Sequence, residues 1–194
     1  KAYLRELSAG GIPTVPTLWL DQGAADGLAR LLETGWGEVV VKPAVSIGAI
    51  GALRADARDP ACQAHLVALL ADGDVMVQPF VASVARDGEV SLVYFGGNFS
   101  HAIRKQPAEG DFRVQEMHGG TVHAWTPAAD ELALATRALA ATPAPTTYAR
   151  VDLVRLPDGQ PAVMELELIE PELFLGASPE VAPRFAEVLR NYAG

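Results

Sequence analysis

The stretch Met164-Glu165-Leu166-Glu167-Leu168 decides how the rest of this sequence is interpreted. Side chains of a strand alternate between its two faces, so Glu165 and Glu167 point the same way, about 6–7 Å apart. A two-residue turn at Asp158-Gly159 would place Asp152 directly opposite Glu165. Three carboxylates on one face repel each other unless a cation lies among them, and such hard oxygen ligands suit Mg²⁺. The hairpin therefore predicts a metal site.

The same hairpin has a second interpretation, in which its carboxylates only face solvent. Arg150 would lie opposite Glu167 in this register, so an ordinary surface ion pair could explain part of the pattern. The segment alone leaves both interpretations open, and the rest of the chain has to decide between them.

Composition limits the functions that this chain can have. Its 194 residues are enough for one large domain or two small lobes, and a hydrophobic share of 49% allows a sizeable core. The net charge of -9 argues against nucleic acid as a partner. No apolar run reaches the length of a membrane span and no signal peptide opens the chain, so no membrane partner is expected. The single Cys62 excludes an intramolecular disulfide and suits a reducing, cytoplasmic location.

The order of the predicted elements indicates an α+β fold with mostly antiparallel sheets, because hairpins dominate the pattern. We place a small lobe at residues 1–75 and a large lobe at residues 76–194, and ligands often bind between two such lobes. Helices are expected at 1–10, 24–33, 60–70, 127–140 and 179–192, and strands at 38–42, 51–55, 75–81, 90–95, 98–105 and within 148–168.

Two features of the small lobe could serve a nucleotide. Lys42 ends an apolar strand and precedes a loop of small residues, so it can reach a phosphate while the loop covers it. The loop lacks the glycine spacing of a Walker A motif, and a lysine that extends from a strand end into solvent is the plainer alternative. Pro79 interrupts the later strand and has no N–H, which leaves neighbouring backbone groups free to bind a purine edge. A plain edge strand is the alternative there.

A second hairpin turns at Gly96-Gly97. If this turn has two residues, Glu89 faces Arg104 on a polar face, which either meets solvent or lines a cleft. His101 then falls on the apolar face, as an ordinary core histidine. The loop that follows concentrates cations in an otherwise acidic chain, among them Arg113, and arginine suits bidentate binding of phosphate or carboxylate. Scattered surface charge is the alternative.

The order and spacing of these motifs resemble the ATP-grasp superfamily, in its glutathione-synthetase-like branch, over essentially the whole chain. Within that branch the chain looks like the O-ureido-D-serine cyclo-ligase group of D-cycloserine biosynthesis. The stretches that carry this resemblance are GEVSLVYF at 88–95, SHAIRK at 100–105, GDFRVQ at 110–115 and ELELIEP at 165–171.

The resemblance implies an ATP-grasp fold of two lobes with a nucleotide between them. It also implies an N-terminal domain that this sequence lacks, and we expect such a missing part because the chain opens on Lys1 rather than Met. The implied reaction joins a carboxylate to an amine through an acyl phosphate and releases ADP and phosphate. The implied cofactors are ATP and Mg²⁺, as two ions, with Mn²⁺ as a substitute. The implied partners are a small carboxylate or amino acid and the missing domain, with a homo-oligomer left open.

The resemblance also assigns roles to single residues. Arg104 and Arg113 match catalytic positions that bind phosphate or the acyl phosphate. Asp152, Glu165 and Glu167 match the metal ligands. The positions that bind the nucleotide match Lys1, Lys42, Ile47, Gly48, Gln78, Pro79, Phe80, Val81, Glu89 and Met164.

Two departures from the family pattern bear on the substrate. Glu167 stands where glutathione synthetase usually has Asn, which keeps an oxygen ligand. Ser91 stands where that enzyme has a substrate-binding arginine, which argues against glutathione-type substrates. Two alternatives stay open, a glutathione-synthetase-like or amino-acid or peptide ligase with another substrate and a nucleotide-binding module without ligase activity. A third and weaker alternative is an acidic domain that does not use ATP.

Overall fold

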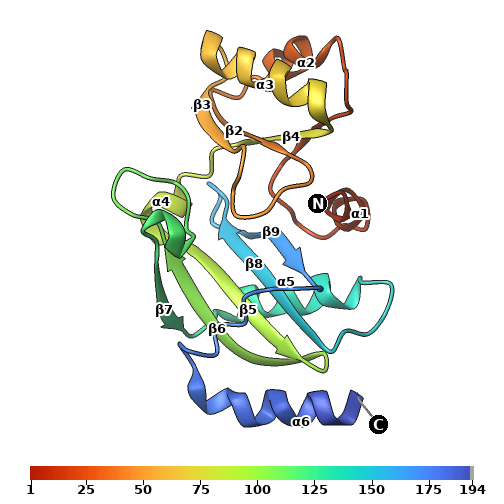
Figure 1. The fold of residues 1–194 in the computed structure, drawn as a ribbon, viewed down its shortest axis with the longest axis vertical. Coiled ribbons are helices and arrows are strands. Elements are labelled where there is room, and N and C mark those ends of the chain that lie inside the picture. Colours follow the sequence, from red (N-terminus) through yellow and green to blue (C-terminus); the bar gives the residue numbers. More distant parts are fainter. Residues whose placement is uncertain (193–194) are drawn as a thin grey trace. The chain divides into compact units, whose positions relative to one another are not determined.

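The computed structural model describes residues 1–192, and contacts within the chain divide it into two compact units. Unit 1 comprises residues 1–2 and 15–80, and unit 2 comprises residues 3–14 together with the chain from Val81 onwards. Each unit contains one antiparallel sheet with helices (Figure 1). The predicted α+β class with mostly antiparallel sheets is therefore confirmed.

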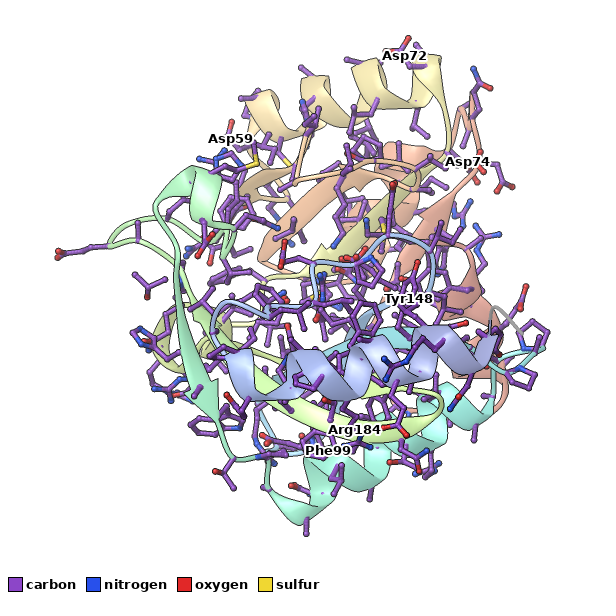
Figure 2. The ribbon with its side chains drawn as sticks, turned by 60° about the horizontal axis from the view of Figure 1, so that its bottom comes forward. Asp59, Asp72, Asp74, Phe99, Tyr148 and Arg184 are labelled. Atoms are coloured by element: carbon purple, nitrogen blue, oxygen red, sulfur yellow. The ribbon has the colours of Figure 1, made fainter. Side chains whose placement is uncertain are left out.

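Unit 1 is built on a four-stranded sheet in the order β1-β4-β2-β3. The helix α3 begins where expected, because the Asp59 carboxylate accepts a hydrogen bond from the Ala61 N–H at 2.8 Å and Pro60 supplies a helical φ (Figure 2). Buried side chains of the helices and the sheet, such as Leu31, Val39 and Leu66, form one core. The elements are β1 (Leu18–Leu20), α2 (Gly27–Glu33), β2 (Glu38–Pro43), β3 (Leu53–Asp56), α3 (Pro60–Asp72) and β4 (Val75–Pro79).

Unit 2 is built on a five-stranded sheet in the order β7-β6-β5-β8-β9. Its helix α4 and strand β7 are additions to the elements expected from the sequence. The elements are α1 (Tyr3–Ala9), α4 (Ser83–Asp87), β5 (Glu89–Phe95), β6 (Asn98–Gln106), β7 (Thr121–Trp125), α5 (Ala129–Ala140), β8 (Tyr148–Arg155), β9 (Pro161–Glu167) and α6 (Ala182–Tyr192).

The helices α5 and α6 cover opposite faces of the five-stranded sheet (Figure 1). The Tyr94 hydroxyl lies 3.2 Å from the Thr136 hydroxyl of α5, whereas the Phe95 ring stacks on Phe185 of α6 with centroids 4.8 Å apart. Neighbouring residues of a strand point to opposite faces. We call the face that carries Phe95 face A and the face that carries Tyr94 face B.

A bulge in β6 changes the predicted pairing of the second hairpin. Ser100 has no partner on β5, so the pairing beyond it is offset by one residue. Glu89 pairs with Lys105, and the predicted pairing of Glu89 with Arg104 is wrong. His101 lies on face A for the same reason, rather than on the face of Tyr94. A one-residue offset exchanges the faces of all side chains that follow it.

The carboxylate hairpin reaches the predicted pairing by a different route. Backbone hydrogen bonds at its turn enclose three residues, 157–159, rather than the predicted two. Met164 has no partner on β8, and this second bulge offsets the extra residue of the turn. Asp152 consequently pairs with Glu165, as predicted.

The helix α1 packs within unit 2, although it opens the chain. Its Leu4 and Leu7 are buried, and the segment that follows pairs with β9, where the Val163 N–H donates to the Pro13 carbonyl at 2.9 Å. The predicted division into residues 1–75 and 76–194 differs from these contact units and stays a prediction. No helix in the described part of the chain has the length and apolarity that a membrane span requires.

Candidate functional site

Three carboxylates meet on face A, where β8 and β9 pair. Asp152, Glu165 and Glu167 each offer one oxygen, and these oxygens lie within 4.8 Å of one another. Asp152 is buried, whereas Glu165 and Glu167 are half-buried. Carboxylate oxygens at this spacing are the ligands that a hard divalent cation takes.

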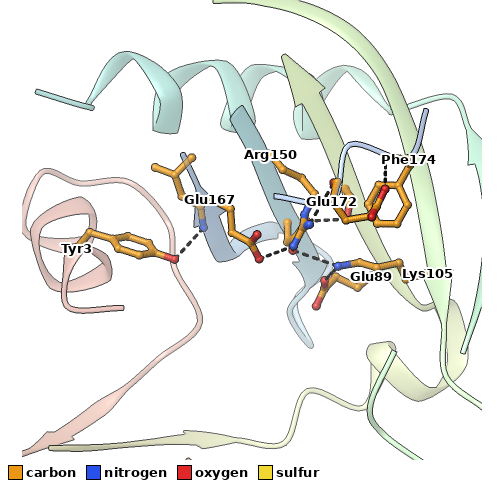
Figure 3. A network of polar contacts seen from close by, with 10 residues as sticks. Tyr3, Glu89, Lys105, Arg150, Glu167, Glu172 and Phe174 are labelled. Atoms are coloured by element: carbon orange, nitrogen blue, oxygen red, sulfur yellow. Dashed lines mark hydrogen bonds and ion pairs between the residues drawn. The ribbon is translucent and has the colours of Figure 1, made fainter. Parts of the chain in front are cut away.

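Two buried cations lie beside the carboxylates (Figure 3). The Lys105 Nζ lies 3.1 Å from Asp152 Oδ2 and also contacts Glu89. Arg150 donates two hydrogen bonds to Asp152, at 2.9 and 3.0 Å, and another to Glu167. Each cation therefore joins carboxylates from different strands of the sheet.

These cations keep Asp152 ionised. Burial would raise its pKa, but Arg150 and Lys105 hold that pKa well below its usual range, with a further hydrogen bond from the Ser91 hydroxyl at 2.6 Å. Burial opposes the charge of Lys105 as well, yet Asp152 and Glu89 raise the pKa of its ammonium group. The network is thus charged and held in place by hydrogen bonds.

Glu167 differs from Asp152 in its protonation. Burial raises the pKa of Glu167 to about 7, and repulsion from Asp152 and Glu165 adds to this effect against the attraction of Arg150. The pKa of this carboxyl lies near neutrality because it is buried beside like charges. A cation added next to it would therefore stabilise its ionised form.

The donor set of this cluster fits a metal such as Mg²⁺, because three carboxylate oxygens converge and each of them is a hard ligand. Burial also raises the pKa of the neighbouring Glu89 carboxyl, against the attraction of Lys105.

Tyr3 of α1 supports the strand that carries two of these carboxylates. Its hydroxyl accepts a hydrogen bond from the Leu166 N–H at 3.0 Å (Figure 3). Leu166 lies between Glu165 and Glu167 in β9, so this bond holds the backbone between the two ligands. Burial, followed by the charge of Glu165, raises the pKa of Tyr3 far above its usual value, and the phenol stays neutral.

Neither of the two arginines predicted to be catalytic contacts the carboxylates within residues 1–192. Arg104 lies on face B, where its guanidinium group sits over the Trp125 ring at 4.6 Å. Arg113 lies in the loop after β6 and binds Asp111 at 2.8 Å, which holds the pKa of Asp111 below its usual range. The cation that β6 brings to the carboxylates is Lys105.

The predicted phosphate-binding residues of unit 1 lie at the end of β2 and in the loop after it. Lys42 pairs with Met76 of β4. The Lys1 Nζ donates to the Ser46 carbonyl at 3.4 Å. In the loop, Ile47 is 71% exposed and Gly48 has a φ of 61°, so an apolar side chain faces solvent beside a flexible backbone position.

The segment predicted to bind adenine continues β4. The Gln78 side chain is buried and its amide donates to the Thr17 hydroxyl at 2.9 Å. Pro79 pairs with Val39, and the Phe80 N–H donates to the Glu38 carbonyl at 2.9 Å. The expectation of a free backbone donor is therefore wrong at Phe80. In unit 2, Val81 is buried, and Met164 is the half-buried residue of the β9 bulge.

Lys105 is the residue that sequence reasoning missed, because the Ser100 bulge has no signature in the sequence. The position of Arg150 was accessible, since residues 150 and 152 share one face of β8. The sequence presented Arg150 only as a partner of Glu167, whereas its two hydrogen bonds to Asp152 place it within the site.

Comparison with known proteins gives consistent results. Residues 24–145 match the family described as prokaryotic glutathione synthetase, ATP-grasp domain. The chain is 38% identical to the Cycloserine biosynthesis protein DcsG of Streptomyces lavendulae, over 97% of this chain and 68% of that protein. It matches the crystal structure of D-cycloserine synthetase DcsG with a TM-score of 0.87 and 36% identity, over 100% of this chain and 70% of that one.

A more distant match shares the fold. The D-alanine–D-alanine ligase from Bacillus anthracis, in a structure complexed with ATP, matches with a TM-score of 0.68 and 18% identity. The match covers 96% of this chain and 61% of that one.

Proposed function

The chain belongs to the ATP-grasp domain family of prokaryotic glutathione synthetase and is an ATP-dependent ligase, and from this premise we propose how its residues act. A substrate carboxylate takes the γ-phosphoryl group of ATP, and a nitrogen nucleophile then displaces phosphate from the acyl phosphate. The carboxylate cluster carries this proposal, because its converging oxygens fit the metal of a metal-bound triphosphate.

Asp152, Glu165 and Glu167 would hold Mg²⁺, as two ions, with Mn²⁺ as a substitute. The metal would neutralise phosphate charge and polarise the phosphoryl oxygens. Lys105 and Arg150 already sit beside Asp152, and their donors can turn from the carboxylates toward a transferring phosphoryl group. The sequence identifies no dedicated general base, so the reaction would depend mainly on positioning and charge neutralisation, and the nitrogen would give its proton to the released phosphate or to solvent.

The nucleotide would be held by the residues that the family resemblance identifies. Two lysines would bind its phosphates, a mobile loop would cover them, and the end of β4 would contact adenine. Arg113 would join the phosphates after release from Asp111, whereas the position of Arg104 on face B gives its predicted role no support. The nucleotide residues are Lys1, Lys42, Ile47, Gly48, Gln78, Pro79, Phe80, Val81, Glu89 and Met164. A cytoplasmic location and a homo-oligomer stay predictions.

We propose a substrate of the O-ureido-D-serine type, an amino acid whose own ureido nitrogen closes a ring on the activated carboxylate. Similarity to proteins named for cycloserine biosynthesis supports this assignment. An amino-acid or peptide ligase with a different acceptor is the rival within the same chemistry.

The test uses the full natural protein with ATP, Mg²⁺ and hydroxylamine, which converts an acyl phosphate into a hydroxamate. O-ureido-D-serine, D-alanine and γ-glutamylcysteine are offered separately. We expect ADP and hydroxamate with O-ureido-D-serine, and loss of both in Glu165→Gln with Glu167→Gln. Glu187→Gln on the exposed side of α6 is the matched control.

Each other outcome contradicts a defined part of the proposal. Hydroxamate with another carboxylate alone rejects the substrate class and retains the ligase chemistry. Binding of Mg-ATP without hydroxamate from any of the carboxylates rejects the proposed reaction in favour of a nucleotide-binding module. Nucleotide binding that survives the double substitution rejects Glu165 and Glu167 as metal ligands.

A further inference from the structure

A cavity of about 230 Å³ lies on face B, on the opposite side of the sheet from the carboxylate cluster. Its walls combine apolar side chains with one tryptophan, two arginines and two carboxylates, and all of them belong to unit 2. The residues on which the argument depends are Val90, Arg104, Trp125, Glu131, Leu153 and Pro161. Nothing in the proposed ligase reaction uses this cavity.

Arg104 is the unusual member of this cavity. Its Nε is buried and has no hydrogen-bond partner among the residues that the structure describes. Buried donors are nearly always paired in folded proteins. The Trp125 ring holds the guanidinium plane by a cation–π contact at 4.6 Å but offers no acceptor. The arginine is therefore oriented, yet its Nε–H has no acceptor among the described residues.

The wall that orients Arg104 is itself fixed. The Trp125 indole N–H donates to Glu131 at 3.2 Å, and the same carboxylate accepts from the Ala128 N–H and from Arg155, both at 2.9 Å. Glu131 is buried. The Glu131 carboxylate thus accepts three hydrogen bonds, one of them from Trp125. This network fixes the position of the indole ring, so the cavity is formed before any ligand binds.

The charged groups of the cavity wall interact with one another. Arg155 joins Glu131 to Asp130, and Asp87 is bound by Arg86 at 2.5 Å and is also attracted by Arg104. What Arg104 lacks among the described residues is a hydrogen-bond acceptor for its Nε. A guanidinium group binds a carboxylate through two parallel hydrogen bonds, and the apolar walls suit a short hydrocarbon chain.

We propose that this cavity is a binding site for a small organic monocarboxylate, with its carboxylate on Arg104 and its apolar part against Leu153 and Pro161. The site is separate from the metal site and does not depend on the proposed ligase function. Its size admits a ligand of a few heavy atoms rather than a nucleotide.

The test is an NMR titration of the chain with sodium butyrate, read at the indole N–H of Trp125. The variant Trp125→Phe identifies this signal among those of the three tryptophans. We expect a saturable shift with butyrate, and no saturation with sodium chloride or inorganic phosphate at equal ionic strength. Arg104→Met should weaken butyrate binding at least tenfold, whereas Arg190→Met on exposed α6 should leave it unchanged.

Arg104→Lys keeps the positive charge but removes the planar guanidinium group with its two parallel donors. This variant tests the role of Arg104 in butyrate binding if Arg104→Met fails to fold. We expect at least threefold weaker butyrate binding in this variant. Binding of butyrate that is equally strong in every folded Arg104 variant overturns the proposal. Saturation by phosphate but not by butyrate overturns the assigned ligand class, and a linear response to all salts shows that there is no site.

Discussion

At the scale of single residues, Tyr3 makes the contact whose effect on the metal site is simplest to isolate. Tyr3→Phe removes the acceptor of the Leu166 N–H and should cost about 1 kcal/mol of stability. It should also raise the KM for Mg-ATP several-fold, because the backbone between Glu165 and Glu167 loses its support. Hydrogen exchange at the Leu166 amide measures the local effect directly.

Tyr148→Phe is the matched control for this prediction. The Tyr148 hydroxyl donates to the Ile169 carbonyl at 2.6 Å, just beyond the same strand, but at an exposed position. Its loss should leave the exchange of Leu166 and the KM for Mg-ATP nearly unchanged. Equal effects of both substitutions would mean that Tyr3 has no particular role in positioning the ligands.

Lys105 should contribute more to the free energy of unfolding than any exposed charged side chain does. Lys105→Met leaves Glu89 and Asp152 buried without their shared cation, so the unfolding free energy should fall by about 3–5 kcal/mol in urea titrations. Arg150 still pairs with Asp152 in this variant, so adding Glu89→Gln removes the carboxylate that lost its ion pair with Lys105 and should restore part of the loss. A cost below about 1 kcal/mol for Lys105→Met would show that the network is not coupled in this way.

The convergence of the three carboxylates could be predicted from the sequence, partly because two errors cancelled. Strand alternation alone puts Glu165 and Glu167 on one face. The pairing of Asp152 with Glu165 held because the turn is one residue longer than predicted and the Met164 bulge absorbs that residue. Neither feature has a reliable sequence signal, so the correct pairing did not follow from a correct hairpin.

At the scale of elements, the strand β6 shows why a site can be hidden from sequence reasoning. Periodicity predicted the strand, but its face depends on whether Ser100 counts as a paired residue. Without the bulge Arg104 faces Glu89, and with it Lys105 does. Tertiary packing chooses between these registers, which is why the predicted partner of Glu89 was wrong by one position.

The junction of α4 and β5 should tolerate no side chain at Gly88. Gly88 has a φ of 83°, and an added Cβ would collide with the carbonyl oxygen of Lys105 in the neighbouring strand. Gly88→Ala should therefore cost more than about 2 kcal/mol and separate the Glu89–Lys105 pair. Gly97→Ala, at a φ of 76° with open space around it, should cost only about 1 kcal/mol. Thermal unfolding of the two variants compares them, and equal melting temperatures would contradict the collision.

At the scale of the whole molecule, the acidic site should make the stability of the metal-free protein depend on pH. The folded state raises the pKa of Glu167 from its usual 4.5 to about 7, mainly through burial. Between these two values the folded chain binds a proton that the unfolded chain does not, so stability increases as the pH falls from 7 toward 5. Because the side chain is partly exposed, we expect a gain of about 1–2 kcal/mol rather than the full shift.

Asp152 has the opposite effect on the pH dependence of stability. It therefore sets the lowest pH at which the gain from Glu167 is seen. Its pKa is lowered in the folded state, so its contribution is present above its usual value and is lost as the pH falls below about 4. Urea unfolding without metal, at pH values from 4 to 8, should show a larger gain in the wild type than in Glu167→Gln, because the raised pKa of the buried Glu89 and the lowered pKa of the buried His101 act in both proteins. Mg²⁺ with a non-hydrolysable ATP analogue should reduce the gain as well, because a bound cation keeps Glu167 ionised. The same slope in all three samples would show that Glu167 does not titrate near neutrality.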